Sequence, residues 1–112
     1  MSGPSQVTET PIERREALVE YLAGGARQRE AWRIGTEHEK FGFRTSDLRP
    51  PTYEGPQGIG ALLEGMAQRF GYERIIEGGH LIALARGTES ITLEPAGQLE
   101  LSGAQLETVH QT

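Results

Sequence analysis

The chain has 112 residues, no cysteine and a net charge of −5, from 16 acidic and 11 basic residues. This length predicts one domain with a modest core. The acidic balance, with Lys40 as the single lysine, argues against nucleic acid as a partner, and the lack of cysteine excludes a disulfide framework or a thiolate metal site. Because neither a secretory leader nor an apolar run of about 18 residues occurs, we expect a cytoplasmic protein without membrane contact.

The N-terminal third is predicted to contain a flexible segment, a helix and a strand. Residues 1–10 are polar and expected to be flexible, and residues 11–112 are expected to form the folded part. Pro11 suits a first helical turn, and apolar side chains then recur on one face up to Gly24, which predicts a helix over residues 11–24. A strand is predicted over residues 33–43, with Trp32 anchoring its start in the core.

The remainder predicts a second helix and four short strands. Apolar residues at three- and four-residue spacing predict a helix over residues 57–70, ended by Gly71. Gly-containing turns separate the predicted strands, which are 74–77, 80–85, 89–94 and 98–101. The last residues, AQLETVHQT, are typical of the first turn of a further helix without a stop signal, so we expect a C-terminally truncated chain. This pattern indicates an α+β fold with an antiparallel sheet and flanking helices.

Glu37 and Glu39 are the first candidate site residues. Side chains alternate between the faces of a strand, so these carboxylates point the same way, about 6.5 Å apart at the backbone. His38 points to the opposite face. Phe41 and Phe43 follow on the face of the glutamates, which is typical of a pocket mouth. The alternative is an ordinary solvated strand face, since glutamate is mostly exposed in proteins.

A second acidic segment carries Glu94 and Glu100 on either side of a Pro-Ala-Gly interruption. Glu100 alternates with Gln98 and Ser102 onto one predicted face, while Leu99 and Leu101 would pack behind it. Hard oxygen ligands of this kind suit Mg²⁺, which prefers one or two carboxylates with water and substrate phosphate. The chain has no Walker A sequence to cradle a nucleotide. Exposed strand glutamates are again the alternative interpretation.

Three sequences, in this order, resemble the glutamate-cysteine ligase family of plants and proteobacteria. They are GTEHEKFGF, YEGPQGIGALLEGMAQRFG and ITLEPAGQLELSGAQLETVHQT, and the resemblance covers residues 32–112. Gln105 departs from the family's usual Ala-Pro-Leu-Glu run. The resemblance implies the N-terminal portion of a single catalytic domain with a glutamine-synthetase-like fold.

The same resemblance implies an ATP-dependent ligase that joins the γ-carboxylate of glutamate to the amine of cysteine through γ-glutamyl phosphate, the first step of glutathione biosynthesis. It implies Mg²⁺ as cofactor, ATP as cosubstrate, Glu37 and Glu39 as catalytic residues, and Glu37, Glu39, Glu94 and Glu100 as metal ligands. As a fragment, the isolated chain is expected to be inactive. The competing hypothesis is a noncatalytic acidic domain that binds a cation or a protein, and the oligomeric state stays open.

Overall fold

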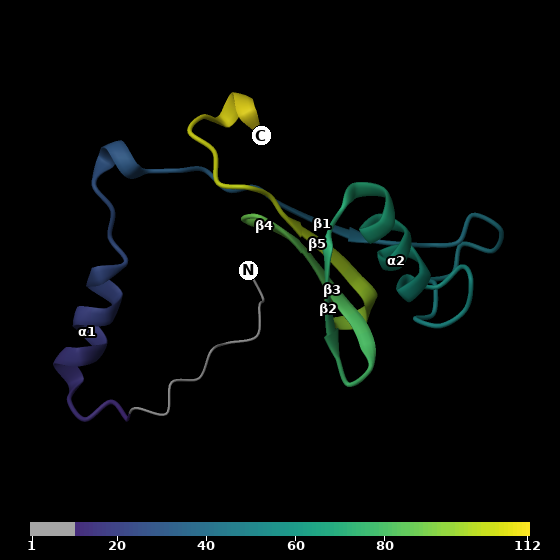
Figure 1. Ribbon diagram of the computed structural model, residues 1–112, viewed down its shortest axis with the longest axis horizontal. Coiled ribbons are helices and arrows are strands. Elements are labelled where there is room, and N and C mark those ends of the chain that lie inside the picture. Colours follow the sequence, from purple (N-terminus) through teal and green to yellow (C-terminus); the bar gives the residue numbers. More distant parts are fainter. Residues whose placement is uncertain (1–10) are drawn as a thin grey trace.

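A computed structural model describes residues 11–112, and it shows one five-stranded antiparallel sheet with two α-helices (Figure 1). The predicted flexible segment, residues 1–10, lies outside the described residues. The strands follow the order β1-β5-β4-β3-β2 across the sheet. Their bounds are β1 Glu37–Phe41, β2 Glu73–Glu77, β3 His80–Arg86, β4 Glu89–Glu94 and β5 Gln98–Ser102, and the helices are α1 Arg15–Gly24 and α2 Ile59–Phe70. The prediction of an α+β fold with an antiparallel sheet is confirmed.

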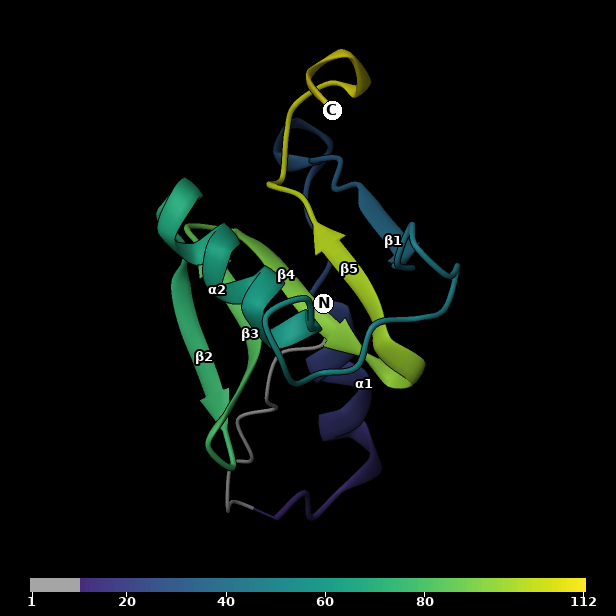
Figure 2. The ribbon, with the colours of Figure 1, turned by 90° about the vertical axis from the view of Figure 1, so that its right-hand side faces the viewer.

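Helix α2 covers one face of the sheet, as Figure 2 shows. Its buried side chains, Ile59, Leu63 and Ala67, recur every four residues and therefore form one stripe. This stripe packs against Leu84 of β3 and Ile91 of β4. Leu93, Leu99 and Leu101 are partly buried against the same cluster, so the prediction that Leu99 and Leu101 pack behind the face that carries Glu100 is confirmed.

Glycine determines both ends of α2. Gly71 takes the left-handed conformation, with φ of 72°, and its N–H donates to Ala67 O, which ends the helix as predicted. Gly58 precedes the first turn, and a Cβ atom there would clash with the backbone carbonyl oxygens of Tyr53 and Glu54. The chain approaches the start of α2 too closely for any other residue.

An ion pair fastens α2 to the edge strand β2. Arg74 donates two hydrogen bonds to Glu64, of 2.8 Å from Nε and 2.6 Å from Nη2. Gln68, one turn along α2, donates to the same carboxylate at 2.8 Å. The Arg74 guanidinium, and then the Gln68 amide, lower the pKa of Glu64 to about 2.

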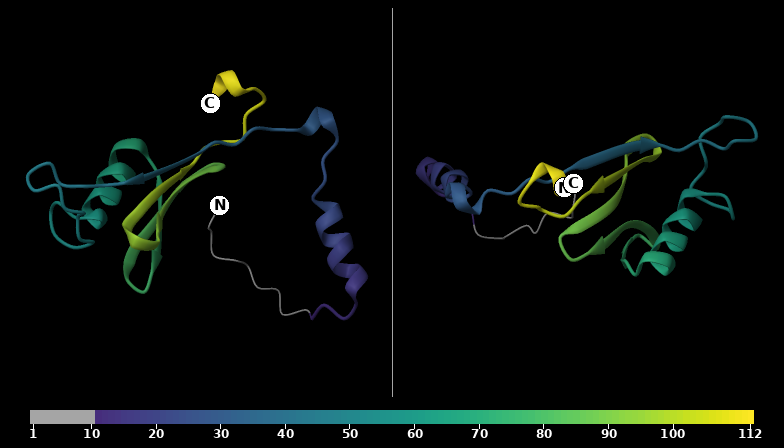
Figure 3. Two further views of the ribbon diagram at one scale, coloured as in Figure 1. Left: turned by 180° about the vertical axis from the view of Figure 1, so that it is seen from behind. Right: turned by 90° about the horizontal axis from the view of Figure 1, so that it is seen from above.

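Helix α1 stands apart from the sheet in Figures 1 and 3, and it has no buried residue. It begins at Arg15, so the prediction of a helix from residue 11 was wrong for its first four residues. Arg14 is still extended, with φ of −141°, and forms an ion pair of 2.9 Å with Glu20. The apolar face that predicted the helix is exposed, with Leu22 76% accessible.

The strand predicted over residues 33–43 is shorter, because only Glu37–Phe41 pair with β5. Residues 33–36 do not continue this ladder, and Ile34 forms an isolated bridge with Leu106. Trp32 is 63% exposed, so its predicted role as a core anchor was wrong. Its indole N–H instead donates to Arg27 O at 2.9 Å, which keeps the ring on the segment before the strand.

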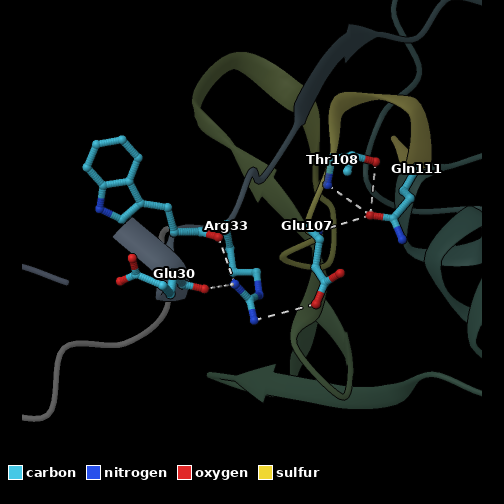
Figure 4. Close-up of polar contacts among 6 residues, drawn as sticks. Glu30, Arg33, Glu107, Thr108 and Gln111 are labelled. Carbon is cyan, nitrogen blue, oxygen red and sulfur yellow. Dashed lines mark hydrogen bonds and ion pairs between the residues drawn. The ribbon is translucent and has the colours of Figure 1, made fainter. Parts of the chain in front are cut away.

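The C-terminal segment runs back along residues 33–36. Gly103 N donates to Thr36 O at 2.8 Å, and the Nη2 of Arg33 lies 3.7 Å from a carboxylate oxygen of Glu107 (Figure 4). The predicted terminal helix is only a 3-10 turn, Val109–Gln111. The Gln111 side chain accepts hydrogen bonds from the backbone N–H groups of Glu107 and Thr108, which closes this turn.

No helix within residues 11–112 is long and apolar enough to cross a membrane.

Two glycines of the α2 region give a matched test of packing. Gly58→Ala should lower the free energy of unfolding by about 1–3 kcal/mol, because the new methyl group enters occupied space. Gly65→Ala should raise it by up to about 1 kcal/mol, because nothing lies within 4 Å of the new Cβ in this helical position. Urea denaturation measures both, and equal effects of the two substitutions would contradict the close approach at Gly58.

The Glu64–Arg74 ion pair predicts a loss of stability in acid. Because folding lowers the pKa of Glu64 from 4.5 to about 2, its contribution is complete above about pH 4.5 and is lost as the pH falls towards 2. Glu64→Gln should therefore lower the melting temperature at pH 6 and have a much smaller effect near pH 2, where about half of the carboxylate is protonated. Glu77→Gln, an exposed glutamate on the same strand as Arg74, is the control. A Glu64→Gln deficit that persisted undiminished at pH 2 would refute the assignment.

Candidate acidic site

The four predicted glutamates lie on one face of the sheet, opposite α2. The register pairs Glu37 with Ser102 and Glu39 with Glu100, and paired residues of neighbouring strands share a face. On the other side of β5, Glu100 pairs with Thr92, and Glu94 follows two residues later on β4. We call this surface, with Glu37, Glu39, Glu94 and Glu100, the acidic face. The sequence prediction that Glu37 and Glu39 share a face is confirmed, and the register places Glu94 and Glu100 on the same face.

Exposure falls from the edge of the acidic face towards its middle. Glu37 and Glu39 on the edge strand β1 are exposed, and Glu94 on β4 is half-buried. Glu100 on β5 is only 8% exposed, and the neighbouring Thr92 and Ser102 are equally buried. Removing a carboxylate from water costs free energy unless hydrogen bonds or a cation compensate for the lost hydration. Glu100, the most buried of the four glutamates, therefore has the greatest need of such compensation.

Two hydroxyl groups hold the two inner carboxylates. Ser102 Oγ donates to Glu100 Oε1 at 2.9 Å, and Thr92 Oγ1 donates to Glu94 Oε1 at 2.8 Å. Each donor lies two residues from its glutamate, on the same face of the same strand. Ser102 was expected on this face, but sequence reasoning missed Thr92. The spacing hydroxyl-x-Glu in an alternating strand is the signal that indicates it.

Glu39 and Glu100 are directly opposed across β1 and β5. Like charges in this arrangement destabilise a sheet, so the pair is an unfavourable choice for structure alone. The carboxylates nevertheless do not close into a cage, since no three His, Cys, Asp or Glu side chains within residues 11–112 are grouped to hold a metal ion. The acidic face therefore offers one opposed carboxylate pair, Glu39 and Glu100, with Glu37 and Glu94 on either side of it.

The turn between β4 and β5 positions Glu94 and returns the chain to Glu100. Pro95–Gly97 form a single 3-10 turn, in which Ala96 and Gly97 have positive φ of 64° and 77°. An alanine in the left-handed region is strained, whereas a glycine is not. This tight connection sets the register that pairs Glu94 with Gln98 and Thr92 with Glu100.

Of the other residues near the glutamates in the sequence or the sheet, some lie off the acidic face and two arginines have structural partners. His38 pairs with Leu101 and so faces away from the glutamates, as predicted. Phe41 shares the acidic face, whereas Phe43 lies beyond the end of β1. Arg44 is bonded to Asp47, and this guanidinium holds the pKa of Asp47 below its usual value. Arg86 donates to Phe70 O at 2.7 Å and lies over the Tyr72 ring, joining α2 to β3.

A small cavity of about 220 Å³ adjoins one end of the acidic face. Its polar lining includes Glu37 and Ser102, together with Thr36, Thr88 and Gln105. A larger hollow of about 550 Å³ lies between the loop after β1 and the start of α2, and none of the four glutamates lines it. Of these two, only the small cavity communicates with the carboxylates.

Comparison with known proteins gives relatives with high identity. The chain is 57% identical over 98 residues to a chloroplastic glutamate-cysteine ligase of Nicotiana tabacum, 51% over 106 residues to that of Medicago truncatula, and 54% over 98 residues to that of Arabidopsis thaliana. These alignments cover 88%, 95% and 88% of this chain. They cover only 18%, 20% and 18% of the relatives, so the chain spans about a fifth of their length.

These relatives contradict the predicted cytoplasmic location, because their names place them in the chloroplast. The prediction considered only secretory leaders and membrane spans. A chloroplast transit peptide has neither an apolar core nor a membrane-spanning length, so that argument could not address this location.

The sequence model of glutamate-cysteine ligase family 2 matches residues 33–112. This range contains the whole sheet, α2 and all four glutamates of the acidic face. The match confirms the resemblance carried by the three sequences around Glu37, Gly58 and Glu94. The chain belongs to glutamate-cysteine ligase family 2.

Proposed function

We propose that this chain supplies the acidic face of an ATP-dependent glutamate-cysteine ligase. The observation that carries the proposal is the meeting of Glu37, Glu39, Glu94 and Glu100 on one face of the sheet, from strands β1, β4 and β5. Relatives that carry the ligase name align over 88–95% of the chain, which supports this activity over others. In the proposal, the sheet is part of a glutamine-synthetase-like fold.

The donor chemistry of the acidic face fits Mg²⁺. All candidate ligands are carboxylate oxygens, which hard divalent cations prefer. Mg²⁺ commonly takes one or two protein carboxylates and completes its shell with water and substrate phosphate, so the opposed pair Glu39 and Glu100 suffices without a closed cage. Glu37 and Glu94 flank this pair and complete the proposed ligand set. Bound Mg²⁺ would neutralise charge on the phosphates of ATP.

The proposed reaction has two steps. An oxygen of the glutamate γ-carboxylate attacks the γ-phosphorus of ATP, the bond from that phosphorus to ADP breaks, and γ-glutamyl phosphate forms. The cysteine amine then attacks the acyl carbon, phosphate leaves, and the nitrogen loses a proton. This reaction is the first step of glutathione biosynthesis.

In this scheme the chain's residues orient the reactants. Glu37 and Glu39 are the proposed catalytic residues, because they project from the exposed edge strand where substrates can reach them. The buried Glu100 supplies the fixed inner side of the site. Electrostatic stabilisation of this kind supplies much of the catalysis in phosphoryl transfer. Glutamate, cysteine and ATP are therefore the proposed partners.

Ligand preference separates this proposal from a noncatalytic acidic domain. The chain should bind L-glutamate more tightly when Mg²⁺ is present, because the cation offsets repulsion between the substrate carboxylates and the acidic face. Isothermal titration with L-glutamate, D-glutamate and succinate, each with and without Mg²⁺, measures this. We expect an L-glutamate preference that needs Mg²⁺. Equal binding of all three acids would favour the noncatalytic domain.

Cation binding tests the carboxylate pair directly. Glu39→Gln should weaken Mn²⁺ binding, followed by water-proton relaxation, by at least about 10-fold, since even residues that only orient metal ligands typically contribute 10–100-fold. The same change should leave folding stability unchanged or raise it by about 0.2–1 kcal/mol, because it removes a like-charge contact.

Glu73→Gln is the matched control for this experiment. Glu73 lies on the same face, in the opposite edge strand β2, where it pairs with Ala85. Its substitution should leave Mn²⁺ affinity unchanged. If Glu39→Gln and Glu73→Gln had the same small effect, the cation would be held by diffuse negative charge and not at the proposed pair.

A further inference from the structure

Ser102 makes a buried hydrogen bond to the innermost carboxylate of the acidic face. Its hydroxyl and the Glu100 carboxylate are 2.9 Å apart, and each residue is only 8% exposed. A hydrogen bond to an ionised acceptor is strong, and it strengthens further where water is excluded. The bond also restricts how the carboxylate can rotate, and hence the directions in which its second oxygen can point.

The residues that pair with Glu100 on the two neighbouring strands do not hold its carboxylate beside Glu39. On β1, Glu39 lies opposite Glu100, and its negative charge would repel the Glu100 carboxylate. On β4, Thr92 lies opposite Glu100, but its hydroxyl donates to Glu94. Ser102 stands two residues along β5, where its hydroxyl can hold Glu100 in place beside Glu39. Its backbone position is fixed in turn by pairing with Glu37 and Ser90 on the two neighbouring strands.

We propose that Ser102 is a positioning residue, which orients the carboxylate of Glu100 so that Glu100 and Glu39 can bind one divalent cation together. This inference rests on the proposed function, since it assigns the cation to the acidic face. Ser102 acts through Glu100 and does not itself touch the cation. Groups that orient metal ligands in this way typically contribute 10–100-fold to metal affinity.

The test uses the whole chain, selectively labelled at glutamate, and needs two readouts. Without metal, the three-bond couplings along the Glu100 side chain report whether it occupies one rotamer. With metal, water-proton relaxation reports Mn²⁺ affinity. Ser102→Ala should produce averaged couplings and weaken Mn²⁺ binding about 10-fold or more. Ser102→Thr keeps the hydroxyl and tolerates a strand, so it should retain one rotamer and affinity within about 2-fold of the wild type.

Ser90→Ala is the matched control, because Ser90 lies opposite Ser102 on the same face. It should change neither readout. Thermal melting of each variant confirms folding, and Ser102→Cys, with its weak thiol donor, replaces Ser102→Ala if the alanine variant does not fold.

The outcomes separate this inference from the proposed function. A folded Ser102→Ala chain with a single Glu100 rotamer, or with unchanged Mn²⁺ affinity, overturns the positioning role. If Ser102→Ala lowers the melting temperature alone, the hydroxyl is structural. A wild-type chain without Mn²⁺ affinity overturns the proposed cation site, and the metal-free couplings then decide by themselves whether Ser102 fixes Glu100.

Discussion

The packing of α2 against a single face of the sheet is the constraint on which the other features depend. The buried stripe of α2, Ile59, Leu63 and Ala67, packs against strand residues whose side chains point towards the helix. Leu84 and Ile91 are examples. Because side chains alternate along each strand, every position between these apolar residues is assigned to the other face. Among the described residues 11–112, no α-helix packs on the polar residues of β4 and β5, and these residues form part of the acidic face.

Local patterns predicted the elements that combine a strong periodicity with a clear boundary. The sequence predicted the apolar stripe of α2 and its end at Gly71, and it also predicted the alternating strands β4 and β5. The start of β1 was not predicted, because whether residues 33–36 join a strand depends on the segment that follows Ser102. That segment contacts them through the Ile34–Leu106 bridge and the hydrogen bond from Gly103 N to Thr36 O, without forming a continuous ladder. The prediction that Trp32 is buried failed for the same reason. The apolar character of a side chain does not specify which other residues pack against it.

The candidate site shows the same division. Alternation predicted that Glu37 shares a face with Glu39, but no local rule could place Glu39 opposite Glu100, which requires the register between two strands distant in sequence. The hydrogen bonds from the Thr92 and Ser102 hydroxyls to the glutamates were similarly hard to predict, because Ser and Thr also occur in exposed strands. The structure identifies their partners: Ser102 donates to the buried Glu100, which is 8% exposed, and Thr92 donates to the half-buried Glu94.

Stability and activity place opposite demands on the acidic face. Facing carboxylates weaken the sheet, while a neutral side chain in place of Glu39 would relieve the repulsion and remove the proposed ligand. The apolar packing beneath the face, centred on the fully buried Leu63 and Leu84, offsets this cost without approaching the carboxylates. Such separation lets one side of a sheet be optimised for packing while the other keeps charges that the fold alone would not favour.

The strand order also determines when the acidic face can form during folding. β2, β3, β4 and β5 are consecutive neighbours, so they can assemble as hairpins with short loops. β1 precedes them all in sequence, yet it pairs with β5, and the intervening chain must close a long loop before that pairing forms. Contacts between distant segments are slow to form, so we expect β1 to dock last. The carboxylates of β1 and β5 would then remain separated until the hydrophobic core exists, and their repulsion would not oppose the early steps of folding.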